Sequence, residues 1–510
     1  MTPPMPSGGA RLSARLGQAL AGRRWAPAVA WLRRRAAQAD WIAWAVAGLG
    51  FALYLTLTLA RWHRQDAPSL DLAIFEQAVK GYAHFGPPIV DIKGPGANQL
   101  GDHFSPILAL LAPFYRVFPS PVTLLVAQCV LVALSIVPVT ALARRRLGRW
   151  SGLAFGAAYA LSWGLQTGVD AQFHEYAFAV PMLAFALAAA LDQRWTAAAL
   201  WAAATVTVKE DMGLTVIAFG AVMAGHGWWL RRREAAARNR DAWWPECRAG
   251  LLLIGGGLTA FVLVFGLLMP AFKGGDWYYW GKVDQTGGAL GLIVGILEPP
   301  VKLKTLALVS AVVMGTCWLS RWSLVALPTL FWRFASTDSA HWGTMWHYSM
   351  ILMPMVFLAA LDVLGRWRAS KRRWPRGVAR VTVAASLAFA VVATAWFPLG
   401  KLTRPDTYAP SPRADQAARV LELIPDGASV ASDRGLITQL ATDHVVYWIG
   451  DYADRVQPDY VLLDPMSGWS NDPGGAEGYA ESVYGGDYEP VGGIGPPDDQ
   501  TAYRLARRLP

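Results

Sequence analysis

Residues 42–60 read I-A-W-A-V-A-G-L-G-F-A-L-Y-L-T-L-T-L-A, an apolar run without a charged side chain, and this run decides the fold. At about 1.5 Å per residue it makes a helix of about 28 Å, close to the ~30 Å hydrocarbon core of a membrane. Arg33, Arg34 and Arg35 precede it. Because the run exceeds the ~7–15 residues of a cleaved signal core, we interpret it as a signal anchor that stays in the membrane.

The composition of the whole chain also indicates a membrane protein. Of the 510 residues 54% are hydrophobic and only 16% are charged, with a mean hydropathy of +0.28. The net charge is +10, but Arg and Lys cluster in short runs between apolar stretches, which is typical of membrane topology rather than of nucleic-acid binding. Cys129, Cys247 and Cys317 are far apart and offer neither a disulfide framework nor a zinc site.

Apolar segments recur along the chain and predict an all-α polytopic membrane protein with about eleven transmembrane helices. A shorter segment, 104–118, contains Pro106 and Pro113, and we interpret it as interfacial or half-inserted. The expected spans lie near residues 42–60, 121–143, 151–168, 176–191, 195–208, 212–230, 249–271, 304–320, 322–335, 348–364 and 378–398.

The basic residues follow the positive-inside rule. With the N-terminus inside, the arginines of alternate loops fall in the cytoplasm, and the intervening loops, rich in Asp, Glu and His, fall outside. We therefore expect a multi-pass plasma-membrane protein with a cytoplasmic N-terminus and an extracytoplasmic C-terminus. The cytoplasmic runs are residues 144–146, Arg194, 231–233, Arg321 and 366–376.

The composition changes after residue 398. Residues 411–424 read as a short amphipathic helix, and 429–432, 444–448 and 460–463 read as short strands, which predicts a small α/β domain. Residues 467–500 are dense in Gly, Pro, Asp and Tyr, and we expect them to be loosely ordered. Four parts are expected: a basic cytoplasmic tail over 1–40, a transmembrane domain over 41–398 with a long first outer loop at 61–104, an extracytoplasmic α/β domain over 399–466, and a Gly/Pro/Asp-rich tail over 467–510.

The first outer loop contains two carboxylates of interest, in the stretch Asp71-Leu-Ala-Ile-Phe-Glu-Gln77. One interpretation is structural, with Asp71 starting a loop helix and Glu76 facing water. The other is chemical, with Asp71 as a general base. The spacing leaves both interpretations open.

A second group of polar residues joins two expected spans, in Asp170-Ala-Gln-Phe-His-Glu-Tyr176. On a helical turn Asp170 and His174 share a face, so they can bind a metal, orient one another or contact a phosphate. The alternative is a solvated loop with Tyr176 at the membrane interface.

Three consecutive charges, Lys209, Glu210 and Asp211, separate two apolar segments. The segment before them, 195–208, makes a helix of only about 21 Å, so its outer end is expected to lie below the membrane surface. Charges at that depth need a wet cavity or mutual pairing. Lys209 would then neutralise a phosphate while Glu210 or Asp211 holds it in place or meets a metal. The alternative is an ion-paired helix end.

Two further loops combine aromatic and polar side chains. Asp338, His341 and His347 lie among tryptophans in the loop 336–347, and the loop 271–303 contains Asp276-Trp-Tyr-Tyr-Trp280. Aromatic rings beside polar groups suit carbohydrate stacking and the membrane interface equally well.

These motifs together resemble a known family. The set Asp71-Leu-Ala-Ile-Phe-Glu-Gln77, His103-Phe-Ser-Pro106, His174-Glu175 and Lys209-Glu-Asp211 is similar to an uncharacterised family of bacterial multispan membrane proteins, catalogued as a domain of unknown function. That family lies near the GT-C superfamily of glycosyltransferases, which use polyprenyl-phosphate-linked sugars. The resemblance covers roughly residues 40–465 and rests also on the signal anchor, the long acidic first loop and the C-terminal α/β domain.

The resemblance implies an inverting transfer of a sugar from a polyprenyl-phosphate donor to a glycan or lipid acceptor of the cell envelope. A divalent metal such as Mg²⁺ or Mn²⁺ is a further implied partner of the phosphate. The implied roles are Asp71 (the general base) and Glu76 as catalytic residues; His103, His174, Lys209, His341 and His347 as ligands of substrate or phosphate; and Asp170, Glu175, Glu210 and Asp211 as metal ligands.

The second outer carboxylate common in that superfamily is not fixed by spacing, and Glu76, Asp91, Asp102 and Asp170 are all candidates. Two other functions also remain open. A transporter or flippase of a lipid-linked or anionic solute would place ionisable residues near the midplane and open to both sides. A non-catalytic scaffold with the same fold would tolerate the loss of Asp71.

Overall fold

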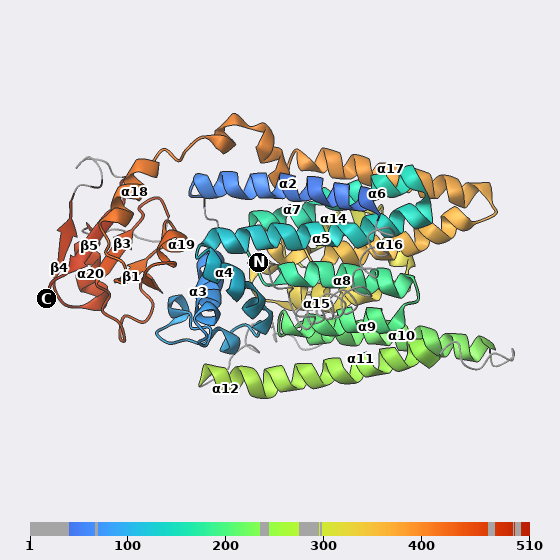
Figure 1. The fold of residues 1–510 in the computed structure, drawn as a ribbon, viewed down its shortest axis with the longest axis horizontal. Coiled ribbons are helices and arrows are strands. Elements are labelled where there is room, and N and C mark those ends of the chain that lie inside the picture. The colour runs from blue at the N-terminus through green and yellow to red at the C-terminus, as the bar shows by residue number, and fades with distance from the viewer. Residues whose placement is uncertain are drawn as a thin grey trace, which may run out of the picture.

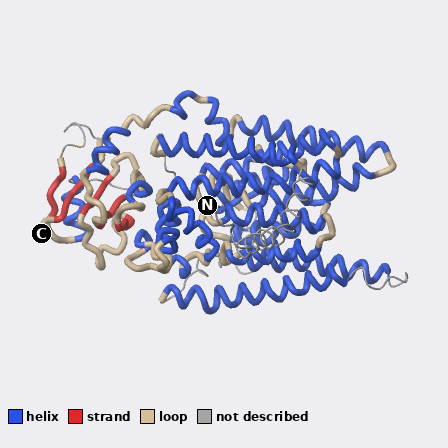
Figure 2. The backbone as a smooth tube through the Cα atoms, in the orientation of Figure 1, coloured by secondary structure: helices blue, strands red, loops and turns tan. Residues whose placement is uncertain are grey.

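The computed structural model describes residues 40–66, 70–234, 244–274, 295, 298–467, 475–492, 494 and 501–510. These residues form a long helical bundle with a small α/β domain at one end (Figure 1). Strands are found only in that domain within the described residues (Figure 2). The basic tail expected over residues 1–40 lies outside the described residues except for Asp40, and so does the stretch Asp276 to Trp280.

The bundle is built from helices of very different length. Two short helices, α3 (Asp71–Ala83) and α4 (Ala112–Val117), lie between the bundle and the α/β domain (Figure 1). The bundle helices are α2 (Trp41–His63), α5 (Pro121–Leu147), α6 (Arg149–Ala160), α7 (Trp163–Asp170), α8 (Tyr176–Leu191), α9 (Trp195–Ala204), α10 (Met212–Glu234), α11 (Trp244–Leu263), α12 (Met269–Lys273), α14 (Pro300–Ala311), α15 (Leu327–Ala335), α16 (Leu352–Ala369) and α17 (Arg373–Thr394).

Six stretches in the described residues are long and apolar enough to cross a membrane. They are Trp41–His63, Pro121–Leu147, Met212–Arg232, Trp244–Lys273, His347–Ala369 and Arg373–Thr394. The expected total of about eleven therefore stays a prediction.

Several of the other expected spans are interrupted helices. The segment 151–168 is divided between α6 and α7. The hydroxyl of Tyr54 donates to the carbonyl of Ala160 at 2.6 Å, which gives the last carbonyl of α6 a partner outside its own helix. In the segment 195–208, α9 likewise ends at Ala204, and a 3-10 turn, η4 (Thr205–Thr207), follows it.

Two glycine positions set the spacing between α10 and α11. A Cβ added to Gly220 would lie 2.6 Å from the Gly250 carbonyl oxygen, and one added to Gly250 would lie 2.5 Å from the Ala224 nitrogen. Only glycine permits so close an approach of two helix backbones. The hairpin of α10 and α11 therefore depends on these positions.

The C-terminal domain has a five-stranded mixed sheet in the order β2-β1-β3-β5-β4. β1 pairs in parallel with β2 and β3, whereas β5 is antiparallel to both β3 and β4. Its elements are β1 (Ser429–Ser432), β2 (Val445–Trp448), β3 (Tyr460–Leu463), β4 (Tyr488–Val491), β5 (Arg504–Arg508), α18 (Ala414–Glu422), α19 (Ile437–Leu440) and α20 (Gly475–Tyr484).

The sheet continues beyond the expected boundary at residue 466. β5 lies between β3 and β4, and Leu505 and Ala506 on it are buried. The described residues of the 467–510 segment therefore complete the sheet and its core instead of forming a separate tail. Two short strands in this segment could not be recognised from the sequence, because each has only four or five residues and the segment around them is polar.

The α/β domain is attached to the bundle through α3. Gln77 donates to the carbonyl of Val446 on β2 at 3.3 Å, and Lys80 donates to the carbonyl of Thr442 at 2.6 Å. The Oε1 atom of Glu76 accepts from the hydroxyls of Thr442 at 2.6 Å and of Tyr115 at 2.8 Å. One loop helix thus holds the domain at this end of the bundle.

The arginine runs lie at the opposite end. The last turn of α5 carries Arg144, Arg145 and Arg146, and Arg145 pairs with Asp192 at 2.6 Å. The ends of α10 and α16 and the start of α17 lie at the same end of the bundle (Figure 1). The bundle therefore has an arginine end and a domain end, as the loop charges predicted.

Replacing Gly220 by valine is expected to force α10 and α11 apart, because the new side chain meets backbone atoms. Overpacking of this kind costs about 1–3 kcal/mol. The thermal unfolding midpoint in detergent should fall for Gly220→Val. Gly255→Val on α11 is the matched control, since a Cβ there meets nothing within 4 Å. Equal midpoints for the two variants would contradict the close helix contact.

Candidate active site

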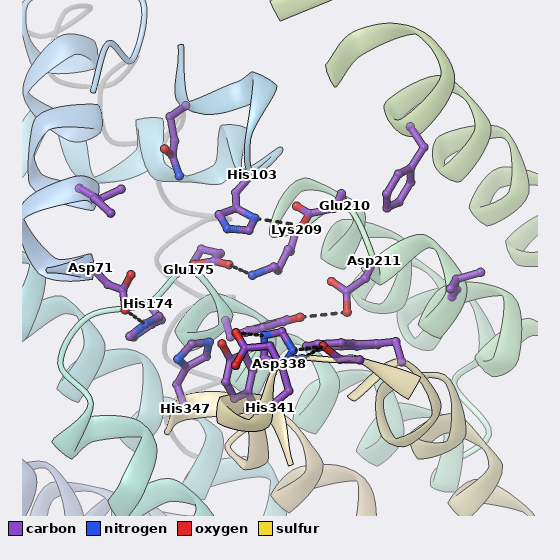
Figure 3. Close-up of a pocket in the computed structure, with 18 of the residues that line it drawn as sticks. Asp71, His103, His174, Glu175, Lys209, Glu210, Asp211, Asp338, His341 and His347 are labelled. Carbon is purple, nitrogen blue, oxygen red and sulfur yellow. Dashed lines mark hydrogen bonds and ion pairs between the residues drawn. The ribbon is translucent and has the colours of Figure 1, made fainter. Parts of the chain in front are cut away.

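A cavity of about 430 Å³ lies at the domain end of the bundle, where several loops and helix ends meet. It is lined by polar residues from α3, from the loops before α8 and α10, and from the loop before α16 (Figure 3). Its apolar wall comes from Ile74, Phe75, Leu214, Phe261, Phe265, Phe331 and Trp332. A concave apolar site with a few convergent polar groups is the usual form of a ligand site.

Asp71 is the first residue of α3, where a carboxylate interacts favourably with the helix dipole. Its Oδ2 atom lies 3.1 Å from the Nε2 atom of His174 (Figure 3). The Asp71 side chain is 40% exposed and the His174 side chain is 3% exposed. Asp71 therefore presents a carboxylate to the cavity while a buried imidazole fixes its position.

The loop that carries His174 is held in place from two sides. The backbone nitrogen of His174 donates to Oε1 of Gln128 on α5 at 2.9 Å. Gln172 adopts a left-handed conformation with φ of 68°, which turns the chain between α7 and α8. The His174 ring also stacks on the ring of His347, with centroids 3.5 Å apart. These contacts leave the imidazole little freedom to move.

Lys209 is buried and forms an ion pair with Glu175, with Nζ and Oε1 2.7 Å apart (Figure 3). Its ammonium also lies 4.7 Å from the centroid of the Tyr176 ring. Burial alone lowers the pKa of Lys209, but the neighbouring carboxylates of Glu175, Glu210 and Asp211 outweigh burial and raise it above its ordinary value. Lys209 is therefore a fixed cation at neutral pH.

The two carboxylates after Lys209 have different partners. Glu210 accepts from the backbone nitrogen of Phe104 at 3.1 Å, and its other oxygen lies 3.0 Å from Nδ1 of His103. Burial raises the pKa of Glu210, but His103 and Lys209 bring it below its ordinary value. Asp211 accepts from the Tyr176 hydroxyl at 2.9 Å. Burial raises the pKa of Asp211 to about 7, although Lys209 opposes the shift.

The loop 336–347 completes the cavity. Arg333 on α15 is fully buried and donates to the carbonyl oxygens of His341 at 2.9 Å and Gly343 at 3.0 Å. Nδ1 of His341 lies 2.6 Å from the Ser336 hydroxyl, and Asp338, His341 and His347 all line the cavity (Figure 3). A buried guanidinium thus fixes the loop that brings two histidines to the site.

The structure places two of the expected site residues elsewhere. Asp71 and Glu76 are five positions apart on α3, so their side chains point about 140° apart, and Glu76 faces Tyr115 and Thr442 instead of the cavity. Asp170 pairs with Arg61 at 2.6 Å and with Lys401 at 3.0 Å. Neither carboxylate lines the cavity, so a catalytic role for Glu76 and a metal role for Asp170 do not fit these positions.

The other candidates for the second carboxylate also lie outside the cavity lining. Asp91 accepts from the backbone nitrogen of Gly96 at 2.9 Å, and Asp102 pairs with Lys93. The acidic residues that line the cavity besides Asp71 are Glu175, Glu210, Asp211 and Asp338.

The expected metal ligands do not converge. Glu175, Glu210 and Asp211 each contact a different partner, and Asp170 is outside the cavity. Within the described residues no group of three or more His, Cys, Asp and Glu side chains is arranged to hold a metal ion. A divalent ion needs several oxygen ligands around one point, so these residues as placed do not fit Mg²⁺ or Mn²⁺.

The lining also includes Lys93 and Gln99, which were not recognised from the sequence. Lys93 forms an ion pair with Asp102. Gln99 begins a 3-10 turn, η2 (Gln99–Gly101), and its side chain is buried. The loop 84–105 folds back on itself through contacts such as the bridge between Ile89 and Asn98. The positions of Lys93 and Gln99 depend on this irregular path, so no regular spacing in the sequence indicates them.

Fold and cavity together define a class of protein: a polytopic membrane protein with a charged cavity at the end of the bundle that carries the α/β domain. Residues 66–492 match the family described as predicted membrane protein, DUF2079. The chain therefore belongs to the DUF2079 family. No curated protein matches the chain.

Solved structures are similar over most of the chain. The crystal structure of ArnT from Cupriavidus metallidurans bound to undecaprenyl phosphate matches with a TM-score of 0.53 and 12% identity, over 91% of this chain and 97% of ArnT. The apo oligosaccharyltransferase of Archaeoglobus fulgidus matches with a TM-score of 0.43 and 12% identity, over 87% of this chain and 71% of that one. The family match confirms the resemblance to an uncharacterised family of membrane proteins, and the likeness to ArnT shows that the chain has a similar fold.

Glu76 is expected to make the stability of the folded protein depend on pH. Burial raises the pKa of Glu76 from 4.5 to about 7, although the hydrogen bonds from Thr442 and Tyr115 oppose the shift. The folded protein then binds this proton more tightly than the unfolded chain does, so stability falls by about 3 kcal/mol as pH rises from 4.5 through 7. Glu76→Gln removes the titrating group and should be more stable than wild type at pH 8 but not at pH 5.

The measurement is the difference in unfolding midpoint between variant and wild type across this pH range. The matched control is Glu422→Gln, because Glu422 on α18 is exposed, and its midpoint should follow wild type at every pH. A Glu76→Gln difference that is the same at pH 5 and pH 8 would contradict the burial of an ionisable carboxyl at this contact.

Proposed function

We propose that this protein is a membrane glycosyltransferase that moves a sugar from a polyprenyl-phosphate donor to a glycan or lipid acceptor of the cell envelope. The observation that carries the proposal is that Asp71, His174 and Lys209, from three separate segments, line one cavity of about 430 Å³. The GT-C-like fold adds support, and a protein with this fold, ArnT, was crystallised with undecaprenyl phosphate.

In the proposed reaction Asp71 takes the proton of an acceptor hydroxyl as its oxygen attacks the anomeric carbon of the sugar. The bond between that carbon and the phosphate oxygen breaks, and the lipid phosphate leaves with the bonding electrons. Attack from the side opposite the phosphate inverts the configuration. His174 holds the Asp71 carboxylate in position at 3.1 Å.

The departing phosphate gains negative charge, and fixed cations stabilise it best. Lys209 remains protonated in the cavity because the surrounding carboxylates raise its pKa. Lys93 and His103 line the same space.

Transport is a weaker proposal, because a transporter exposes its site alternately to both sides. Beyond the cavity the bundle is filled by Phe155, Tyr159 and Phe357, each 0% exposed, with the Phe357 centroid 5.2 Å from each of the other two. The polar side chains gather at the domain end, and the arginine runs at the other end. With the arginine end in the cytoplasm, the proposed reaction takes place on the outer face, with the C-terminus extracytoplasmic.

Asp71→Asn is expected to reduce transfer about 10²–10⁴-fold, because it removes a general base while keeping the size of the side chain. The measurement is release of polyprenyl phosphate from radiolabelled polyprenyl-phosphate sugars by purified protein in lipid bilayers. Asp415→Asn on α18, which is exposed, is the matched control and should keep wild-type turnover. Equal turnover in wild type and Asp71→Asn would contradict the proposed mechanism and would favour a scaffold.

Removing the cation is expected to slow transfer about 10²–10³-fold. Lys209→Met alone leaves Glu175 as an uncompensated buried charge, at a cost of about 3–5 kcal/mol in stability. The double variant Lys209→Met with Glu175→Gln avoids that charge, so it separates folding from chemistry. A folded double variant with wild-type turnover would exclude Lys209 as the group that stabilises the leaving phosphate.

A further inference from the structure

Within the described residues, two polar side chains of the cavity lining, Gln99 and His347, have no hydrogen-bond partner for either of their polar atoms. Gln99 is 1% exposed and lines the cavity. Within the part of the chain that the structure describes, neither its Oε1 nor its Nε2 atom forms a hydrogen bond. A buried amide in this state costs about 1–3 kcal/mol for each unsatisfied group, so it calls for an explanation.

A loosely held loop does not explain the missing bonds, because the backbone at this position is fixed. The Gln99 nitrogen donates to the carbonyl of Pro88 at 2.9 Å, and the Gln99 carbonyl accepts from the nitrogen of His103 at 2.8 Å. Gly101, at the end of the same turn, packs against α12, where an added Cβ would lie 2.6 Å from the Lys273 nitrogen. The backbone thus fixes where this buried side chain begins, and both of its polar atoms lack a partner within the described residues.

Lys209, His103 and Asp71 differ from Gln99, since each contacts another ionisable side chain of the cavity. Lys209 pairs with Glu175, His103 with Glu210, and Asp71 with His174. Gln99 does not ionise, and its amide offers a donor and an acceptor side by side. It therefore suits a ligand group that is also neutral.

The two unused atoms restrict the chemistry of that group. A phosphate oxygen only accepts hydrogen bonds and would leave Oε1 unsatisfied, whereas an ammonium only donates and would leave Nε2 unsatisfied. Two adjacent hydroxyls satisfy both atoms, because one can donate to Oε1 while the other accepts from Nε2. Glu175 Oε2 and Asp211 Oδ1, in residues that line the same cavity, have no hydrogen-bond partner among the described residues and can accept from further hydroxyls.

We infer that Gln99 is a specificity-determining residue that recognises two adjacent hydroxyls of the transferred sugar. The inference rests on the proposed function, and it adds that this end of the cavity recognises the sugar part of the donor. A site built to hydrogen-bond a hydroxyl rejects strongly an analogue that lacks it, because the buried polar group is then left unpaired. Gln99 contacts the sugar only, so the lipid phosphate is bound independently of it.

The test compares binding of polyprenyl-phosphate sugars, across a panel of neutral pentoses and hexoses, with binding of bare polyprenyl phosphate. Wild type is expected to prefer at least one sugar-bearing lipid, and Gln99→Leu should lose at least about tenfold of that preference with unchanged affinity for the bare lipid. Gln457→Leu in the α/β domain is the matched control, because Gln457 is exposed and lies far along the chain from the cavity. Gln99→Asn, which keeps both amide atoms one methylene further back, should retain part of the preference.

Deoxy analogues of the preferred sugar locate the contact. In wild type the preference should fall at two adjacent positions, and in Gln99→Leu removal of those same hydroxyls should cost nothing more. A folded Gln99→Leu protein that prefers the sugar-bearing lipid as strongly as wild type does would overturn the inference. If its unfolding midpoint is also higher than that of wild type, the amide binds only water. The proposed function fails separately, if wild type shows no preference for any sugar-bearing lipid, and the inference then falls with it.

Discussion

Charged groups inside an apolar bundle have to be paired, and this constraint determines the site. Lys209 and Glu175 are both buried, and each would be costly without the other. Their pairing joins the loop before α10 to the loop before α8. The pair of His103 and Glu210 joins the first long loop to the same place. Satisfying these charges therefore brings distant loops together around one cavity.

The helix α3 connects this cavity to the α/β domain. Its first residue, Asp71, faces the cavity and His174, whereas Glu76, Gln77 and Lys80 on the same short helix hold the domain. A movement of the domain that shifts α3 would also move the Asp71 carboxylate. The thirteen residues of α3 thus couple the position of the domain to the position of the proposed base.

Much of the bundle could be predicted from the sequence, because apolar length and arginine runs are local properties. The anchor at 42–60 is α2, and the arginines of α5, α10 and α16 gather at one end. Interrupted helices such as α6 and α7 could not be predicted, since the contact at their break, from the Tyr54 hydroxyl to the Ala160 carbonyl, joins residues far apart in the sequence. The sheet was partly missed because β4 and β5 are short strands in a polar segment.

The residues of the candidate site also include some that could be predicted from the sequence and some that could not. Asp71, His103, His174, Lys209, His341 and His347 were recognised as polar residues in apolar surroundings, and all of them line the cavity. Glu76 was predicted from its motif and Asp170 from its helical spacing to His174, but in the structure Glu76 contacts Thr442 and Asp170 pairs with Arg61, and neither lines the cavity. Gln99 carries no sequence signal, because what distinguishes it is that its side chain has no hydrogen-bond partner in the part of the chain that the structure describes.

The central claim is that one cavity holds a lipid-linked sugar with its reacting carbon at Asp71 and its phosphate at Lys209. The most direct measurement is an electron cryo-microscopy structure of the Asp71→Asn protein in a lipid bilayer with a polyprenyl-phosphate sugar. The account predicts density for the sugar between residue 71 and Gln99 and for the phosphate within hydrogen-bond distance of Lys209. Density for the donor outside this cavity, or a phosphate that contacts other cations instead of Lys209, would contradict it.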